Sequence, residues 1–152
     1  MASQNKEIFI PGPSGRIQAK YFKSKQHGAP IALVLQPHPQ YGGTMNNRIV
    51  YETFNAYLNN GFSVVRINFR GVEKSDGMFD NGQGELSDAA AALDWIEKDN
   101  ENYSQCWVSG FSFSIQSNAA AASESSPWPL SNTPSLLSTP LKFILITENL
   151  FL

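Results

Sequence analysis

The residues that most clearly suggest a reactive site are Gly110-Phe111-Ser112-Phe113-Ser114, which follow a short apolar run, Cys106 to Val108. A strand that turns abruptly into a helix through the pattern G-x-S-x-G holds its serine on a tight elbow, with the hydroxyl pointing outward. Gly110 and Ser112 match this pattern, whereas Ser114 replaces the second glycine. We therefore interpret Ser112 as a candidate nucleophile. The alternative is an ordinary strand-to-helix turn in which Ser112 caps the helix.

A second candidate element is the loop from Pro37 to Gly43, with the sequence PHPQYGG. Acyl transfer needs two backbone N–H groups aimed at the developing oxyanion, one of them from the residue after the nucleophile. Phe113 N–H is the predicted first donor, and Gln40 N–H is the second, because Pro39 has no N–H to offer. The loop residues with a predicted supporting role are His38, Gly42 and Gly43. The alternative is a surface turn in which His38 is a structural hydrogen-bonding residue.

The predicted site lacks the groups that normally activate a serine. After Ser112 the sequence contains no histidine and no aspartate, and its only acids are Glu124 and Glu148. Both histidines, His27 and His38, precede the serine. Because a serine hydroxyl without a base is a poor nucleophile at neutral pH, the chain as written is expected to be feebly hydrolytic at best.

Other kinds of site are not indicated. The segment Asp76 to Glu85 departs from the calcium-loop pattern, and Gly82-Gln83-Gly84 lacks the third glycine of a dinucleotide fingerprint. Two histidines and one cysteine do not make a zinc site, so we expect no metal and no cofactor. A net charge of -2 without basic clusters argues against nucleic-acid and membrane partners. A small-molecule substrate is the expected partner.

The elements that must position these residues alternate between strand and helix. Two short N-terminal strands are expected to form an antiparallel hairpin, and continuous apolar runs indicate strands buried on both faces. The predicted elements are strands Ile8–Ile10, Arg16–Phe22, Ile31–Leu35, Phe62–Phe69 and Cys106–Val108, a helix from Asn46 or Asn47 to Gly61, and a helix over Leu86–Ile96. This order predicts an α/β fold with a mostly parallel sheet and helices on both faces. The loops after Leu35, Phe69 and Val108 should then carry the chemistry.

The C-terminal part differs in composition from the rest. Four of the nine prolines lie between residues 126 and 141, and serine becomes frequent. We predict an N-terminal unit over residues 1–125 and an irregular tail over 126–152, with an edge strand at 141–147. A change of reading frame near Ser114 is our hypothesis for this shift; a naturally short protein is the alternative. The single cysteine and the polar N-terminus favour a cytoplasmic location.

Three stretches of the chain together resemble the N-terminal half of bacterial α/β-hydrolases: LVLQPHPQYGGTMNN (33–47), INFRGVEKSDGMFDNGQGELSDAAAALDW (67–95) and VSGFSF (108–113). The similarity covers about residues 6–113 and points to predicted hydrolases allied to dienelactone hydrolases and S33-type peptidases. It implies a Ser-Asp-His triad that hydrolyses esters, thioesters or amides without a cofactor. Departures from the family pattern are Gln36 in place of His, and Glu73 and Ser114 in place of Gly. By this resemblance Arg70, Gly71 and Gly110 shape the neighbourhood of Ser112.

Two classes of function follow from these observations. The first is a serine hydrolase of small substrates that uses Ser112, Phe113 and Gln40 in an incomplete α/β-hydrolase domain. The second is a non-catalytic product, either a truncated or frame-shifted remnant or a binding module. In both, the strand that ends near Val108 lies close to an open sheet edge, through which self-association is expected.

Overall fold

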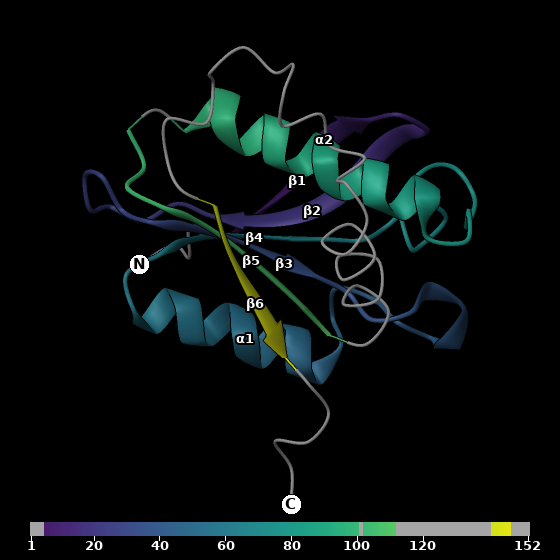
Figure 1. Cartoon of the computed structure of the whole chain (residues 1–152), viewed down its shortest axis with the longest axis horizontal. Coiled ribbons are helices and arrows are strands. Elements are labelled where there is room, and N and C mark those ends of the chain that lie inside the picture. Colours follow the sequence, from purple (N-terminus) through teal and green to yellow (C-terminus); the bar gives the residue numbers. More distant parts are fainter. Residues whose placement is uncertain (1–4, 101, 112–140, 147–152) are drawn as a thin grey trace, which may run out of the picture.

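The computed structural model describes residues 5–100, 102–111 and 141–146 of the 152-residue chain. Its elements are β1 (Asn5–Gly12), β2 (Gly15–Phe22), β3 (Ile31–Leu35), η1 (Pro39–Tyr41), α1 (Arg48–Asn59), β4 (Ser63–Ile67), α2 (Gln83–Asp99), β5 (Cys106–Phe111) and β6 (Leu141–Ile146). The strands form a 6-stranded sheet in the order β1-β2-β4-β3-β5-β6. Helices α1 and α2 lie on opposite faces of this sheet (Figure 1).

The directions of the strands agree with the predicted topology. β1 and β2 form an antiparallel hairpin, and β2 is also antiparallel to β4. β4, β3, β5 and β6 run parallel to one another. The prediction of an α/β fold with a mostly parallel sheet and helices on both faces is therefore confirmed. Because the parallel strands end at one edge, the loops that follow β3, β4 and β5 meet there.

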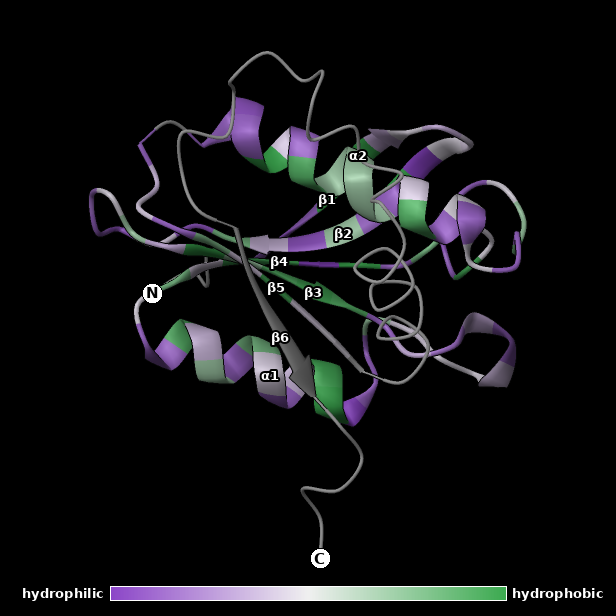
Figure 2. Cartoon of the chain, viewed as in Figure 1, coloured by the Kyte–Doolittle hydropathy of each residue, from purple (hydrophilic) through white to green (hydrophobic). Residues whose placement is uncertain are grey.

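The centre of the sheet is buried on both faces, as continuous apolar strands predict. Every residue of β3 and β4 is buried, and β3 is hydrophobic along its whole length (Figure 2). Alternate residues point to opposite helices because successive side chains of a strand face opposite ways. The α2 face buries Leu33, Val65, Ile67, Ala92 and Ile96, and the α1 face buries Ala32, Val34, Val64, Val50 and Phe54.

The two helices begin at capped positions. The Asn47 side chain accepts a hydrogen bond from Ile49 N–H at 2.9 Å, which confirms one of the two predicted start sites of α1. α1 ends at Asn59, and Gly61 follows with a left-handed φ of 82°. α2 begins at Gln83, earlier than the predicted Leu86. The reason is Glu85, whose carboxylate accepts hydrogen bonds from the backbone N–H groups of Asp80 and Gly82 and so stabilises an extra N-terminal turn.

β5 is longer than predicted and has a neighbour on each side. It continues past Val108 to Phe111, because its last residues pair with β6: Gly110 lies opposite Leu145 and Phe111 opposite Ile146. β6 is the last strand in the order of the sheet. In the described part of the chain, no helix has the length and apolarity needed to cross a membrane.

Candidate active site

The candidate site lies at the edge where β4, β3 and β5 end. Val34 of β3 lies opposite Arg66 of β4 on one side and Ser109 of β5 on the other, so the three strands reach this edge together. The predicted nucleophile Ser112 and the oxyanion donor Phe113 lie outside the described residues, as do Ser114 and both late glutamates. Gly110 is placed: it lies within β5, is buried and pairs with β6.

The loop after β3 is folded tightly on itself. His38 caps the short η1 turn: its Nδ1 accepts a hydrogen bond from Gln40 N–H at 3.2 Å, and its carbonyl accepts from the N–H groups of Tyr41 and Gly43 at 3.2 and 3.1 Å. Gly42 has a left-handed φ of 76°. A Cβ at Gly43 would lie 2.4 Å from the carbonyl oxygen of Pro37, so only glycine permits this close approach.

Gln40 N–H, the predicted second oxyanion donor, is thus engaged within its own loop. To bind an oxyanion it must leave His38 Nδ1 for the developing negative charge. The exchange is favourable in sign, because a hydrogen bond to a charged acceptor is stronger than one to a neutral imidazole nitrogen. His38 meanwhile performs the structural role that the sequence left open as the alternative.

Gln36, which sequence reasoning noted only as a departure from the family pattern, fixes this loop. It is fully buried at the end of β3. Its Nε2 donates to the carbonyls of Gly43 and Pro37 at 2.6 and 3.2 Å, and its Oε1 accepts from Phe69 N–H at 2.7 Å. One amide therefore ties the loop after β3 to the end of β4. The sequence could have indicated this role, because Gln36 comes directly after a continuous apolar strand, and a polar side chain buried there must have hydrogen-bond partners.

A second buried amide joins the same two loops to β2. Asn68 Oδ1 accepts from Met45 N–H at 2.8 Å, and Asn68 Nδ2 donates to Gln18 Oε1 at 2.9 Å. The Ser75 hydroxyl donates to the Asn68 carbonyl at 2.8 Å and accepts from Gln18 N–H at 2.9 Å. These partners satisfy the buried polar groups and hold the loops after β3 and β4 in one arrangement.

Arg70, placed next to the site by resemblance, forms a buried ion pair with α2. Its Nε and Nη2 donate to the two carboxylate oxygens of Asp88 at 3.1 and 2.9 Å, and its backbone N–H donates to Asp88 as well. These bonds to Asp88 raise the pKa of Arg70. A Cβ at Gly84 would lie 2.2 Å from Arg70 Nη1, so the guanidinium packs directly on the helix backbone. Gly71 next to it has a left-handed φ of 73°.

Arg66 is a buried cation without a carboxylate partner among the described residues. Its Nη1 donates to the Met45 carbonyl at 2.8 Å and to Asn46 Oδ1 at 3.3 Å. Its guanidinium lies over the rings of Phe54 and Tyr51, 4.9 and 5.3 Å from their centroids. Nε has no hydrogen-bond partner in this part of the structure, and burial lowers the pKa of Arg66. No signal in the sequence identified this residue.

Two other nucleophilic side chains of β5 are held in inert states: Ser109 towards the candidate edge and Cys106 at the opposite end of the strand. The Ser109 hydroxyl is fully buried and hydrogen-bonded to the Tyr57 hydroxyl, whose pKa is raised by burial. Burial also raises the pKa of the Cys106 thiol to about 12, so it stays protonated near neutral pH.

Among the described residues there is no group of three or more His, Cys, Asp or Glu side chains that could hold a metal ion. A depression of about 500 Å³ lies at the opposite edge of the sheet, between the β2–β3 loop and the end of α2. Its lining includes Lys23, Lys25, Lys98 and Tyr103, and none of the predicted site residues that the structure describes belongs to it.

Comparisons with known proteins agree with this arrangement. The family model of X-Pro dipeptidyl-peptidases (S15 family) matches residues 12–129. An uncharacterized protein of Rickettsia prowazekii is 52% identical over 107 residues, which cover 70% of this chain and 45% of that protein. The chain thus spans less than half the length of this curated relative.

Several solved structures match nearly the whole chain, and two of them are more than 30% identical to it. One is a protein of unknown function from Agrobacterium tumefaciens, proposed to be an alpha/beta hydrolase, with 40% identity and a TM-score of 0.75 over 93% of this chain and 70% of that one. The other is an alpha-beta serine hydrolase homologue from Coxiella burnetii, with 31% identity and a TM-score of 0.72 over 95% of this chain and 75% of that one.

The sheet, its two helical layers and the loops at its carboxyl edge define an incomplete α/β-hydrolase fold, and the predicted superfamily is confirmed. Within that superfamily the chain belongs to the X-Pro dipeptidyl-peptidase (S15) family.

Proposed function

We propose that this chain is a serine hydrolase of small esters, thioesters or amides, with Ser112 as its nucleophile. The observation that carries this proposal is the pairing of β3 with β5. These strands are adjacent and parallel, so the loop from Pro37 to Gly43 after β3 lies beside the C-terminal end of β5. Ser112 is the residue that follows this end in the sequence. Family membership supplies the chemical class.

In this proposal the Ser112 oxygen attacks the acyl carbon and the carbonyl oxygen becomes the oxyanion. The N–H groups of Phe113 and Gln40 donate to it, the latter after leaving His38 Nδ1. The tetrahedral intermediate expels its alcohol, thiol or amine, and water then releases the acyl group. The serine proton passes to solvent, and solvent returns a proton to the departing alcohol, thiol or amine.

A fluorophosphonate probe tests the assignment, because it forms a stable adduct with an activated serine. We expect labelling of the intact chain, loss of labelling in Ser112→Ala, and unchanged labelling in Ser87→Ala, which removes an exposed serine of α2. Labelling that persists in Ser112→Ala contradicts the assignment. Complete absence of labelling in a folded chain favours the second proposal, a non-catalytic remnant or binding module that keeps the loops without the base.

The remnant proposal has its own test in the nucleotide sequence. If the reading frame changes near Ser114, translation of the alternative frame gives a continuation with an aspartate and a histidine in the order expected of the family. Absence of both residues in that frame refutes the frame change.

The proposed setting is cytoplasmic, and the proposed partners are a small-molecule substrate and, through the sheet edge, a second copy of the chain.

A further inference from the structure

Three ring side chains from two different loops meet at the candidate edge. His38 and Tyr41 come from the loop after β3, and their ring centroids are 4.6 Å apart. Phe79 comes from the loop between β4 and α2, and its ring centroid is 5.3 Å from that of His38. The rings are tilted at 56° and 36° to one another, and both centroid distances lie within the range of about 4.5–7 Å that is typical of favourable aromatic pairs. We call His38, Tyr41 and Phe79 the aromatic rim.

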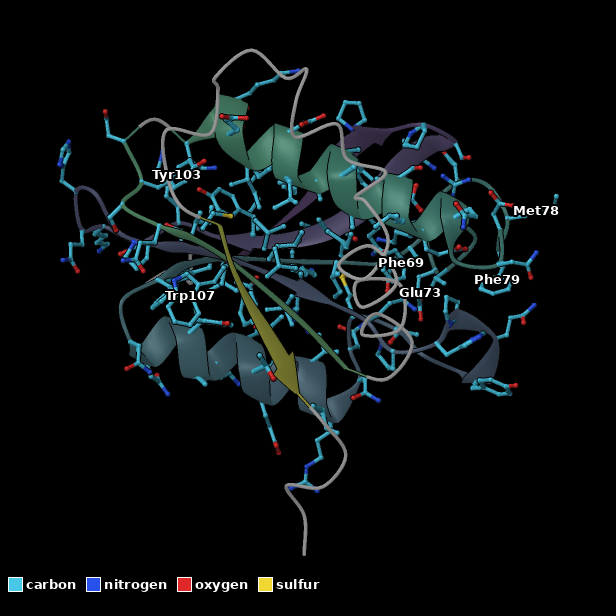
Figure 3. The ribbon with its side chains drawn as sticks, viewed as in Figure 1. Phe69, Glu73, Met78, Phe79, Tyr103 and Trp107 are labelled. Atoms are coloured by element: carbon cyan, nitrogen blue, oxygen red, sulfur yellow. The ribbon has the colours of Figure 1, made fainter. Side chains whose placement is uncertain are left out.

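The aromatic rim presents apolar surface to solvent. Tyr41 is 86% exposed and the neighbouring Met78 is 82% exposed, more than the other exposed large hydrophobic side chains in the described part of the chain. Met78 and Phe79 both lie at the end of the molecule where the parallel strands terminate (Figure 3). Single exposed hydrophobic residues are ordinary, but their collection on two loops beside a candidate site indicates a binding surface.

The loops that carry the rim are fixed on both sides. Gln36 holds the loop that carries His38 and Tyr41, because its side-chain amide donates a hydrogen bond to the Gly43 carbonyl. On the other side, Asp76 N–H donates to the Arg16 carbonyl, and the Asp76 carbonyl accepts from Gly71 N–H. The Asp76 carboxylate also accepts from Arg16 N–H at 2.8 Å. The rim is therefore a preorganised surface, which lowers the entropy cost of binding a ligand.

We propose that the aromatic rim is an acyl-group subsite that receives an aromatic ring of the substrate. The proposal rests on the proposed function, because it assigns the rim to the acyl group that Ser112 attacks. Gln40, the proposed oxyanion donor, lies between His38 and Tyr41 in the sequence, so a carbonyl bound at its N–H has the rim as its neighbour. A flat ring adds to the exposed face of Tyr41 in the same tilted geometry that the rim residues already adopt.

The two histidines allow a direct test by NMR that needs no catalysis. His38 lies in the rim and His27 lines the depression at the other edge, so the imidazole C–H signals of His27 are an internal control. We expect 3-phenylpropanoate to shift the His38 signals in a saturable manner without moving those of His27. Propanoate, which carries the same carboxylate without the ring, should leave both unchanged.

Variants of the rim sharpen the test. We expect Tyr41→Ala and Phe79→Leu each to weaken 3-phenylpropanoate binding by roughly two- to tenfold. Tyr51→Ala, which removes a half-exposed tyrosine of α1 outside the rim, should leave the affinity unchanged. Phe79→Leu keeps an apolar side chain against the core, and the dispersion of the amide proton signals verifies that each variant is folded.

Several results overturn the subsite: equal shifts of both histidines, equal shifts with propanoate, or an affinity that Tyr41→Ala and Phe79→Leu leave unchanged. His38 signals that move with protein concentration alone would assign the rim to contact with a second copy instead. Fluorophosphonate labelling separates this proposal from the hydrolase proposal. Labelling of Ser112 without the NMR shift refutes the rim alone, whereas the shift without labelling refutes the hydrolase and leaves an aromatic-ligand site.

Discussion

At the scale of single residues, the geometry of the candidate site depends on buried amides more than on the charged groups near it. Gln36 has no exposure to solvent and satisfies two carbonyls and one N–H with a single side chain. A neutral histidine also carries one donor and one acceptor, so it can serve both neighbouring chain segments. A purely apolar side chain can serve neither.

We therefore expect Gln36→Leu to lower the free energy of unfolding by about 2–4 kcal/mol, because it removes the buried hydrogen bonds of the Gln36 amide to Phe69 N–H and to the Gly43 carbonyl. Gln36→His should retain most of the stability. Urea denaturation measures both, with Gln83→Leu at an exposed position as the control. A loss for Gln36→Leu no larger than that of the control would show that water replaces the amide.

Cys106 provides a prediction about pH. Its pKa rises from 9.0 to about 12 on folding, first because of burial and then because of the negative charge of Glu97. The folded state therefore keeps the proton that the unfolded chain releases above pH 9. The stabilisation is complete below pH 9 and is lost as the pH rises from 9 towards 12.

The expected result is a free energy of unfolding that falls between pH 9 and pH 11 more steeply in the natural chain than in Cys106→Ala. Urea unfolding at a series of pH values measures the two slopes, and their difference removes the contributions of other titrating groups.

In addition, iodoacetamide at pH 8 should leave the folded thiol unmodified and react with it after unfolding. Rapid modification of the folded protein would contradict the burial of this group.

At the scale of elements, α2 is positioned by its charged first turns as well as by its apolar face. Asp88 has a side chain only 1% exposed and pairs with Arg70 at 2.9 Å. By contrast, the Arg48–Glu52 pair of α1 is exposed to solvent. A buried pair that loses one partner leaves an uncompensated charge, whereas an exposed pair does not.

Arg70→Met should accordingly cost about 3–5 kcal/mol of unfolding free energy. The double variant Arg70→Met/Asp88→Leu should recover a large part of that loss, because it removes both buried charges. Arg48→Met is the matched control and should change the stability by less than about 1 kcal/mol. Thermal or urea unfolding of the four proteins measures these changes. A double variant that is no more stable than Arg70→Met would contradict the prediction.

The same elements show how far the sequence alone could lead. Apolar runs predicted β3 and β4, and Asn47 predicted the start of α1, because these signals are local. The sequence did not predict the early start of α2, because it depends on a hydrogen bond from Gly82 N–H to the Glu85 carboxylate. It did not predict the length of β5 either, because β5 pairs with β6, which is distant in the sequence. At the site, the importance of the glycines could be predicted from the sequence. The hydrogen bond from Gln40 N–H to His38 Nδ1 could not, because it forms only in the folded turn.

At the scale of the whole molecule, the described sheet ends at β6. β5 lies between β3 and β6, so the strand that leads to Ser112 is paired on both sides, and among the described strands it is β6 that has an unpaired edge. An unpaired edge presents a row of backbone donors and acceptors that a second chain can extend. We therefore propose that the protein self-associates through β6 at high concentration.

Proline variants of β6 can separate pairing with β5 from pairing between copies. In a strand, neighbouring N–H groups point to opposite sides, so one of Phe143 and Ile144 donates towards β5 and the other towards the open edge. Proline removes the N–H at either position. We expect one of Phe143→Pro and Ile144→Pro to lower the stability of the chain, and the other to abolish self-association while the protein stays folded.

Light scattering after size-exclusion chromatography, over a hundredfold range of concentration, measures the association, and urea unfolding measures the stability. The two variants serve as controls for each other, because both place a proline in the same strand. A chain that stays monomeric throughout the range contradicts the proposed edge contact. Equal effects of the two prolines on both measurements would also contradict it, because the asymmetry is a direct consequence of one side of β6 being paired and the other open.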